Sequence, residues 1–229
     1  MGKKIAIYGA GTIGACQATL TSGNGYSTVV IGHSEEGLSR CRNTMLQNWN
    51  DLIAQKLATA ANRRAAMDLV TITNDVSALR DCDIVFEAVS EDVNIKQRVY
   101  SIITEVCGRD IIVVSTTSSI DAAILAEKIE NPARFLIAHP FQPVHMLPLV
   151  EVVRHTETSE ETLNQVCTLL KDLNRQVVML NRSVPGFLVN RFAQALFRES
   201  IYLIEQGITT AADIDRAIKY AVGMRYASI

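Results

Sequence analysis

Near its amino terminus the chain reads Lys4-Ile5-Ala6-Ile7-Tyr8-Gly9-Ala10-Gly11-Thr12-Ile13-Gly14. This is an apolar strand that runs into a G-x-G-x-x-G turn and then into a helical pattern. Gly9 allows a tight turn, Gly11 lets a pyrophosphate approach the backbone, and Gly14 lets the helix pack closely on the strand. A phosphate would then meet the free amides and the positive dipole end of that helix.

A G-x-G-x-x-G turn alone is a weak signal, because glycine-rich turns are common. Here a second apolar run, Ser27–Ile31, follows the helical pattern and completes a βαβ unit. We therefore predict that this unit binds a dinucleotide. The expected contacts are the three glycines together with Thr12 and Ile13, at the start of the helix.

Short apolar runs alternate with helical patterns along the first 180 residues, which is typical of a parallel α/β sheet. The expected strands are Lys4–Tyr8, Ser27–Ile31, Val70–Thr73, Asp83–Glu87, Ile111–Ser115, Phe135–Ala138, Leu147–Val153 and Gln176–Met179. The expected helices cover 12–22, 35–60, 92–106, 120–128 and 159–173, and residues 34–66 form either one long helix or a helical pair. We predict a Rossmann-type, mostly parallel sheet flanked by helices.

The pattern changes at Ser183-Val184-Pro185-Gly186, where the proline suits a helix start. A nearly unbroken helical run, Phe187–Gln206, follows and should end at Gly207. Because apolar residues surround most of this helix, we expect it to be buried on several sides. Thr210–Asp213 is typical of a capping box for a second helix, which Gly223 should end.

These patterns predict a dinucleotide-binding domain over residues 1–184 and a short, all-α domain over residues 185–229. Two helices make a poor core by themselves. The helical domain is therefore expected to pack against the sheet domain, against a partner chain, or against further sequence.

The 229 residues are 48% hydrophobic and 20% charged, with a formal net charge of −2. This composition is typical of a globular protein, and it contains no Lys/Arg cluster that would favour nucleic acid. No apolar run is long enough to span a membrane. The five cysteines are scattered and lack metal-ligand spacing, which favours reduced thiols in a cytoplasmic protein without a metal site.

Two polar residues lie in apolar surroundings where a side chain that carries charge is costly. Glu151 shares a strand face with Leu149 and Val153, so its carboxylate should have a partner. His139 follows an apolar strand, at the carboxyl end where open α/β sheets place their ligands. An imidazole can exchange a proton near neutral pH, and a carboxylate behind it fixes its tautomer. We predict that Glu151 supports His139, whereas an edge-strand glutamate and a structural histidine are the alternatives.

Two further segments place polar groups beside apolar ones. Asn190 lies on the same helical stripe as Phe197 and Ile201, and its amide should have a partner, either backbone or substrate. Ser118 belongs to the hydroxyl-rich run 115–119, which follows a buried strand. One hydroxyl of this run should cap the next helix, and the others would face the same crevice as His139.

Taken together, these segments resemble the 3-hydroxyacyl-CoA dehydrogenase family. The matching segments are GAGTIG (9–14), EAVSED (87–92), STTSS (115–119), HPFQP (139–143), LVEV (149–152) and PGFLVNR (185–191). They occur in the order of the family and span nearly the whole chain, which makes the resemblance far more specific than any single motif.

The resemblance implies an oxidoreductase that moves a hydride between a nicotinamide cofactor and the carbon that bears a 3-hydroxyl group. His139 would accept or return the hydroxyl proton, with Glu151 orienting it. Ser118 and Asn190 would hold the reacting oxygen and the neighbouring carbonyl. The implied contacts of the nicotinamide ribose are Glu91 and Lys96.

The chain departs from the family at two motifs near the substrate. HPFQP (139–143) replaces His-Phe-Phe-Asn-Pro, and STTSS (115–119) replaces Ser-Asn-Thr-Ser-Ser. The proline after His139, Pro148 and the segment GMRY (223–226) are similar to the branch that acts on free hydroxy acids, such as L-gulonate 3-dehydrogenase (lambda-crystallin) and carnitine dehydrogenase. A free hydroxy acid is therefore the alternative to a 3-hydroxyacyl thioester.

A third departure concerns the cofactor, which is NAD or NADP. An acidic residue should close the second strand and hold the adenine ribose hydroxyls. Here His33 and Ser34 follow that strand instead. Because no carboxylate repels a 2′-phosphate at His33, and because Arg40 lies further along the following helix, we predict that NADP(H) is accepted. Glu35 and Glu36 argue for the opposite preference.

The resemblance also implies several further helices after residue 229, which build a dimer interface. Residues 185–229 would then be the start of a larger helical domain, and the partner would be a second copy of the chain.

Two other classes of protein share the expected fold. A non-catalytic, nucleotide-binding or structural protein, such as a lens crystallin recruited from an enzyme, gives no reason to keep His139 and Glu151. The lysine-dependent β-hydroxyacid dehydrogenases carry a lysine on the helix after the domain boundary. Here that helix carries Asn190 with no lysine in the same turn.

Overall fold

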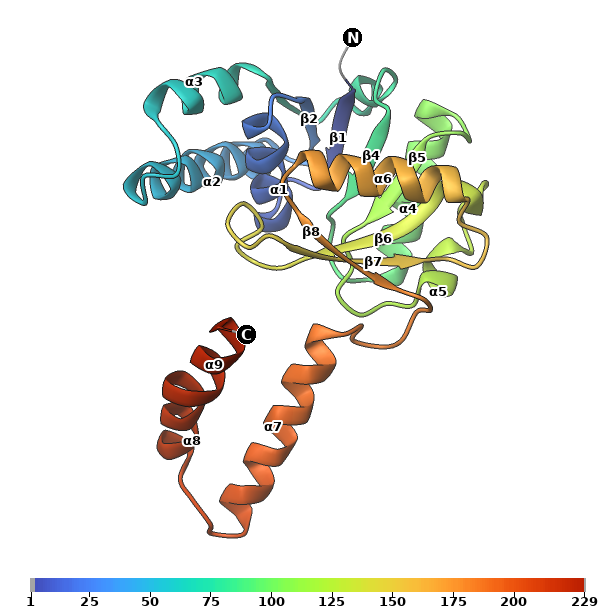
Figure 1. Ribbon diagram of the computed structural model, residues 1–229. Helices are drawn as coiled ribbons and strands as arrows, with labels where there is room; N and C mark the ends of the chain where they lie inside the picture. The colour runs from blue at the N-terminus through green and yellow to red at the C-terminus, as the bar shows by residue number, and fades with distance from the viewer. Residues whose placement is uncertain (1–2, 229) are drawn as a thin grey trace. The chain divides into compact units, whose positions relative to one another are not determined.

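An eight-stranded sheet organises the first 180 residues in the computed structural model, which describes residues 3–228 (Figure 1). The strand order is β3-β2-β1-β4-β5-β6-β7-β8. The strands are β1 (Lys4–Tyr8), β2 (Ser27–Ile31), β3 (Val70–Thr73), β4 (Ile84–Glu87), β5 (Ile112–Ser115), β6 (Phe135–Pro140), β7 (Leu149–Arg154) and β8 (Gln176–Leu180). The first six are parallel, β7 is antiparallel to β6, and β8 is parallel to β7. The predicted fold class is confirmed.

Helices connect the parallel strands. They are α1 (Thr12–Gly23), α2 (Glu35–Ala54), α3 (Ala60–Asp68), α4 (Val93–Cys107), α5 (Ala122–Ala126) and α6 (Glu160–Asp172), with 3₁₀ turns at Val76–Leu79 and Pro132–Arg134. Of the two alternatives for residues 34–66, the helical pair is correct. Thr59 is the N-cap of α3, and its hydroxyl accepts a hydrogen bond from the Asn62 amide.

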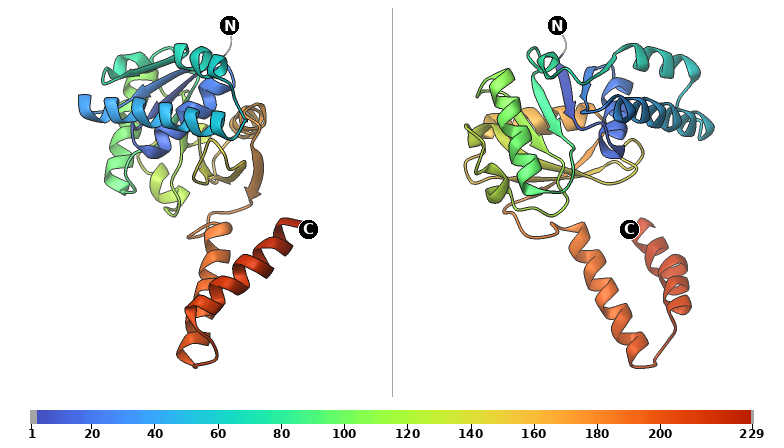
Figure 2. Two further views of the ribbon diagram at one scale, coloured as in Figure 1. Left: turned by 90° about the vertical axis from the view of Figure 1, so that its left-hand side faces the viewer. Right: turned by 180° about the vertical axis from the view of Figure 1, so that it is seen from behind.

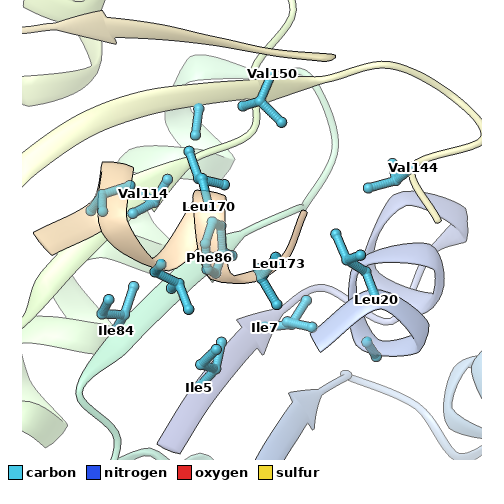
Figure 3. Close-up of a cluster of buried hydrophobic side chains, with 14 of the residues drawn as sticks. Ile5, Ile7, Leu20, Ile84, Phe86, Val114, Val144, Val150, Leu170 and Leu173 are labelled. Atoms are coloured by element: carbon cyan, nitrogen blue, oxygen red, sulfur yellow. The ribbon is translucent and has the colours of Figure 1, made fainter. Parts of the chain in front are cut away.

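The sheet is covered on both faces. Helices α1 and α6 lie on one face and α4 on the other, as the front and back views show (Figures 1 and 2). On the α1/α6 face, alternate residues of the central strands, such as Ile7 and Phe86, form a core with Leu20 of α1 and Leu170 of α6 (Figure 3). Because strand side chains alternate, the residues between them face α4.

The strand order creates a crevice at the carboxyl end of β1. The chain runs outward from β1 through β2 to β3 and then returns to place β4 on the other side of β1. At such a switch point the loops after the two central strands diverge, and open α/β sheets bind their ligands between them. The loop after β1 is the glycine turn, and the loop after β4 begins at Ala88.

A boundary between two compact units lies between Pro185 and Gly186. The second unit contains α7 (Val189–Glu205), α8 (Ala211–Ala217), a π-helical turn (Ile218–Val222) and α9 (Gly223–Ser228). Helix α7 begins later than predicted because Gly186 and Phe187 both have positive φ angles, which an α-helix does not allow. None of the helices in residues 3–228 combines the length and apolarity that a membrane span requires.

One expectation for the second unit is wrong, and one stays a prediction. Gly223 does not end the second helix, because its φ of −61° is helical and the chain continues from the π-helical turn into α9. The expected burial of α7 stays a prediction, since it needs a surface outside the helical unit. None of the residues of α7 is buried, and Phe192 and Phe197 are 60% and 63% exposed. The apolar pattern of a helix predicts that a partner surface exists, and it does not say where that surface lies.

Candidate active site

The glycine turn has the geometry that its sequence predicts. Gly9 has a φ of 132°, and a Cβ atom there would overlap the carbonyl oxygen of Ala88 in the loop after β4. A Cβ atom on Gly14 would overlap the carbonyl oxygen of Gly9. Both positions therefore require glycine for the fold itself. Gly11 differs, since a Cβ atom there would have no neighbour within 4 Å.

The first turn of α1 is open to a ligand. Gly11 occupies the N-cap position, and no side chain caps this helix. By contrast, the hydroxyl of Ser34 caps α2, the carboxylate of Asp92 caps α4, and the hydroxyl of Ser159 caps α6. The amides at the start of α1 are thus available to an anion, which is the role that a helix N-terminus plays in dinucleotide binding.

A cleft of about 310 Å³ lies at this helix start. Its walls are formed by the glycine turn (residues 9–12), the loop after β4 (residues 88–90) and the beginning of α2. Of the predicted cofactor contacts, Gly9, Gly11 and Thr12 line the cleft. Ile13 instead packs against the hydrophobic core, and Gly14 is buried against the turn.

The end of the cleft beside α2 is where a ribose-binding acid was expected. His33 and Arg40 both line the cleft. Ser34 does not line it, and its hydroxyl caps α2 by accepting a hydrogen bond from the Gly37 amide. The guanidinium of Arg40 forms an ion pair with Glu36, and both side chains are largely exposed.

His139 and Glu151 form a buried pair. They lie opposite each other in the register of β6 and β7. Nδ1 of His139 is 2.8 Å from Oε2 of Glu151, and their side chains are 8% and 0% exposed. The ring of Phe141 lies against the imidazole, with 4.7 Å between the ring centroids. Because a carboxylate only accepts hydrogen bonds, this geometry assigns the Nδ1 hydrogen to the contact and directs Nε2 away from Glu151.

His139 belongs to a row of buried polar residues at the carboxyl edge of the sheet. Glu87 ends β4, and its register partner on β5 is Ser115. By strand alternation Glu87, Ser115, His139 and Glu151 all project from the same face of the sheet, the face that α4 covers. Four neighbouring strands thus each contribute one polar side chain to an otherwise apolar layer.

Glu91 joins the loop after β4 to the loop after β5. Its Oε1 accepts hydrogen bonds from the Thr117 hydroxyl at 2.6 Å and from the Ser118 amide at 2.9 Å. The Ser118 and Ser119 hydroxyls also donate to this oxygen. Burial alone would raise the pKa of Glu91, but Thr117, the Lys96 ammonium and the Ser118 amide together lower it from its ordinary value of 4.5.

Lys96 lies in the first turn of α4 and is 1% exposed. Its ammonium is 2.8 Å from Oε1 of Glu87 and 3.3 Å from Oε2 of Glu91. Its charge therefore lies between two carboxylates, and the contact with the nicotinamide ribose that the resemblance implies for Lys96 stays a prediction.

Glu87 is a member of this cluster whose role the sequence did not reveal. Its second oxygen accepts hydrogen bonds from the hydroxyls of Tyr100 and Ser115, both at 2.8 Å. Burial and the neighbouring carboxylate raise the pKa of Tyr100, so the phenol keeps its proton and donates it. The available signal was a glutamate that ends an apolar strand, nine residues before a lysine in the helix that follows.

The remaining predicted site residue, Asn190, lies in the second unit, in the first turn of α7. The structure therefore brings together His139 with Glu151, and Glu91 with Ser118 and Lys96, within the first unit. Among residues 3–228, no group of three or more His, Cys, Asp or Glu side chains is arranged to hold a metal ion.

Comparisons with known proteins agree with this geometry. Residues 4–183 match the family described as 3-hydroxyacyl-CoA dehydrogenase, NAD binding domain, and residues 186–229 match 3-hydroxyacyl-CoA dehydrogenase, C-terminal domain. The chain is 32% identical over 226 residues to the L-carnitine dehydrogenase of Bacillus cereus, covering 98% of this chain and 68% of the relative. It is 29% identical over 216 residues to the 3-hydroxybutyryl-CoA dehydrogenase of Clostridioides difficile, covering 94% and 76%.

A solved structure is similar over the same extent. The (S)-3-hydroxybutyryl-CoA dehydrogenase from Ralstonia eutropha superposes with a TM-score of 0.91 at 28% identity, covering 96% of this chain and 78% of that one. The chain therefore belongs to the 3-hydroxyacyl-CoA dehydrogenase family of NAD-binding oxidoreductases.

Proposed function

We propose that this enzyme transfers a hydride between a nicotinamide cofactor and the 3-hydroxy or 3-keto carbon of an acyl thioester, with His139 as the general base and acid. The observation that carries the proposal is the buried 2.8 Å contact between Nδ1 of His139 and Glu151, at the carboxyl edge of the sheet. The relatives named as 3-hydroxybutyryl-CoA dehydrogenases support this substrate class.

The residues of the cleft fit a dinucleotide. The uncapped start of α1 and the open space above Gly11 would accept the pyrophosphate, and the loop of Ala88, Val89 and Ser90 would form the opposite wall. The bound cofactor supplies the hydride acceptor, and the protein supplies position and acid–base chemistry.

His139 accepts and returns the proton of the substrate hydroxyl. With its Nδ1 hydrogen donated to Glu151, Nε2 has a lone pair that can accept the hydroxyl proton as the alcohol is oxidised. Glu151 then stabilises the imidazolium, and the reverse reaction returns the proton to the alkoxide oxygen. Ser118 would donate a hydrogen bond to a substrate oxygen, and the family resemblance implies a substrate contact for Asn190 as well.

The test is a cofactor-coupled assay with acetoacetyl-CoA, an acetoacetyl carrier protein and free 3-hydroxy acids. We expect turnover of a thioester, and we expect His139→Ala to lower kcat by about 10²- to 10⁴-fold with little change in cofactor affinity. Absence of turnover with every substrate, or full activity of His139→Ala, would refute the assignment.

We infer the cofactor preference from the residues at the far end of the cleft. His33 and Arg40 line it, and neither excludes a 2′-phosphate by charge. NADP(H) is therefore accepted alongside NAD(H), with Arg40 leaving Glu36 to bind the phosphate. The ratio of kcat/KM for the two cofactors measures this. His33→Asp should shift the ratio toward NAD(H), and a wild-type enzyme that uses NAD(H) alone would contradict the prediction.

A second candidate substrate is a small free hydroxy acid. It is favoured by the L-carnitine dehydrogenase relative and by the proline at position 140. The same assay separates the two, since an enzyme of this branch would turn over free 3-hydroxy acids and leave acetoacetyl-CoA unchanged.

A homodimer through the helical unit and a cytoplasmic location complete the proposal. Taken by itself, the helical unit buries none of α7, so this apolar helix requires a partner surface. The five cysteines are free thiols, as a reducing compartment favours.

A further inference from the structure

The loop after β4 forms one wall of the cleft, and its backbone relies on partners outside the loop. Ala88, Val89 and Ser90 line the cleft together with the glycine turn, and none of the three belongs to a helix or a strand. Backbone groups in such a loop still need hydrogen-bond partners. The Ala88 amide donates to the carbonyl of Tyr8 at 2.8 Å. The partners of Val89 are two side chains.

One buried ion pair binds both backbone groups of Val89. The Val89 amide donates to Oε1 of Glu87 at 2.9 Å, and the Val89 carbonyl accepts from Nζ of Lys96 at 3.4 Å. Oε1 of Glu87 and Nζ of Lys96 are 2.8 Å apart, and the two side chains are 0% and 1% exposed. Hydrogen bonds to charged groups are the strong ones, so this pair restrains Val89 on both sides.

Glu87 is also held on its inner side. Its Oε2 accepts hydrogen bonds from the hydroxyls of Tyr100 on α4 and Ser115 on β5, both at 2.8 Å. A carboxylate has about four lone-pair sites, and here two donors bind each of its oxygens. Glu87 therefore has a fixed position at the end of β4, from which it can hold Val89.

The position of this wall matters because the glycine turn lies directly against it. A Cβ atom on Gly9 would overlap the carbonyl oxygen of Ala88 and would lie 3.0 Å from the amide nitrogen of Val89. A shift of Val89 would therefore change the width of the cleft. Buried ion pairs are often no more stabilising than apolar side chains of similar volume. Positioning of the wall gives a reason for this pair that stability alone does not.

We propose that Glu87 is a positioning residue for the cofactor. Together with Lys96 it fixes the backbone of Val89, and so it sets the wall of the cleft beside the glycine turn. This inference rests on the proposed function only for the identity of the ligand in the cleft. It is compatible with the contact between Lys96 and the nicotinamide ribose that the resemblance implies.

Binding of ADP tests the proposal, because ADP contains the diphosphate of the cofactor and lacks the nicotinamide ribose. Glu87→Met removes every acceptor of this side chain and should raise the Kd of ADP, measured by isothermal titration calorimetry, by at least about tenfold. Glu87→Gln should stay within about threefold of wild type, because its amide oxygen can still accept from Val89 and Lys96. The hydroxyls of Tyr100 and Ser115 can rotate to accept from its amide nitrogen.

Tyr100→Phe is the matched control, since it removes one buried hydrogen bond to Glu87 and leaves the contact with Val89. It should lower the stability to urea and keep the Kd of ADP within about twofold, because Ser115 still holds Oε2. An unchanged Kd for ADP in Glu87→Met, or equal losses in Glu87→Met and Glu87→Gln, would overturn the proposal. A loss confined to the reduced cofactor would also overturn it, since Glu87 would then act only through Lys96 at the ribose.

Amide hydrogen exchange at Val89 tests the same contact without any ligand. Glu87→Met should raise the exchange rate of the Val89 amide by at least about tenfold, and Glu87→Gln should raise it by less than about threefold. The amides of β1 and α1 should keep their wild-type rates. An unchanged rate at Val89, or a uniform increase throughout the sheet unit, would refute a positioning role.

Loss of Glu87 leaves Lys96 with Glu91 as its one carboxylate partner, which can unfold the protein. The variant Glu87→Met/Lys96→Met replaces the ion pair by two apolar side chains, a change that buried sites often tolerate. Its Kd for ADP should again exceed that of wild type by at least about tenfold, because neither backbone group of Val89 is held. An unchanged Kd in this double variant would overturn the proposal. If the wild type binds neither ADP nor the reduced cofactor, the proposed function fails, and exchange at Val89 still decides the role of Glu87.

Discussion

At the scale of single residues, the proposed chemistry depends on one hydrogen bond. The contact between His139 and Glu151 selects the tautomer in which Nε2 can accept a proton. A neutral amide at position 151 would keep the shape of the pair. It could, however, donate its own hydrogen to Nδ1 and so stabilise the opposite tautomer.

Glu151→Gln should therefore fold normally and lose activity. We expect kcat to fall by about 10⁴-fold, as it does when the carboxylate of a catalytic triad is replaced by an amide. Cofactor affinity should stay within about twofold, because Glu151 is fully buried and lies on β7, outside the cleft walls. The measurements are steady-state kinetics and fluorescence titration with the reduced cofactor. A kcat within about tenfold of wild type would mean that His139 does not need this tautomer.

Glu91 should make the stability of the fold sensitive to acid. Its pKa is lower in the folded protein than its ordinary value of 4.5, so its ionised form favours folding above that value. This contribution is lost as the pH falls from 4.5 through the folded pKa. Glu91→Gln should therefore be less stable than wild type at about pH 7, and the difference should shrink as the pH falls below about 4 toward about 3.

Urea unfolding at about pH 7, about pH 4 and about pH 3 measures this difference. Glu157→Gln, an exposed position in the turn after β7, is the matched control and should show no such convergence. If the gap between Glu91→Gln and wild type stays constant down to about pH 3, the hydrogen bonds from Thr117 and Ser118 do not hold the carboxylate in its ionised form.

The sequence predicted the two ends of the His139–Glu151 pair because both lie in apolar strands that are close in sequence. It did not reveal the cluster around Glu87. That cluster joins β4, α4 and β5, and its hydrogen bonds depend on the register that places Glu87 beside Ser115. Register between distant strands is set by the whole sheet, and no local pattern of residues encodes it.

At the scale of elements, local patterns were most reliable for the strands at the start of the sheet unit. The first three strands have the predicted bounds, because β-branched runs between turns leave little choice. The helical unit was predicted less well. Gly223 fits a helix end by propensity, yet its backbone is helical there, since a glycine tolerates both conformations.

Two substitutions in the glycine turn separate its contribution to stability from its contribution to cofactor binding. Gly14→Ala should destabilise the protein by about 3 kcal/mol or more, because the new methyl group would overlap the carbonyl of Gly9. Gly11→Ala should leave stability within about 0.5 kcal/mol, since its φ of −82° suits alanine and the space around it is empty.

Gly11→Ala should instead affect the affinity for the cofactor. Gly11→Ala should raise the Kd of the reduced cofactor by at least about tenfold, because its methyl group would occupy the space of the pyrophosphate. Urea unfolding and fluorescence titration of both variants give the comparison. If Gly11→Ala binds the cofactor as wild type does, the pyrophosphate does not lie over this turn.

At the scale of the whole molecule, the resemblance spans both units, with five of its six motifs in the first and PGFLVNR (185–191) at the boundary. The pattern of apolar residues alone could not show which surface covers the helices of the second unit. The stripe of Phe197, Ile201 and Ile204 predicts an apolar contact, and these side chains are 63%, 41% and 41% exposed. A second copy of the chain is the partner that the family resemblance implies.

Light scattering after gel filtration should therefore give a mass near twice the chain mass of 25.2 kDa. Phe197→Glu should shift the mass to that of a single chain at micromolar concentration, because a carboxylate cannot be buried in an apolar interface without a partner. Lys171→Glu, an exposed position on α6, changes charge in the same direction and should remain dimeric. A wild-type protein with the mass of one chain at every concentration would mean that another surface, such as that of its own sheet unit, covers α7.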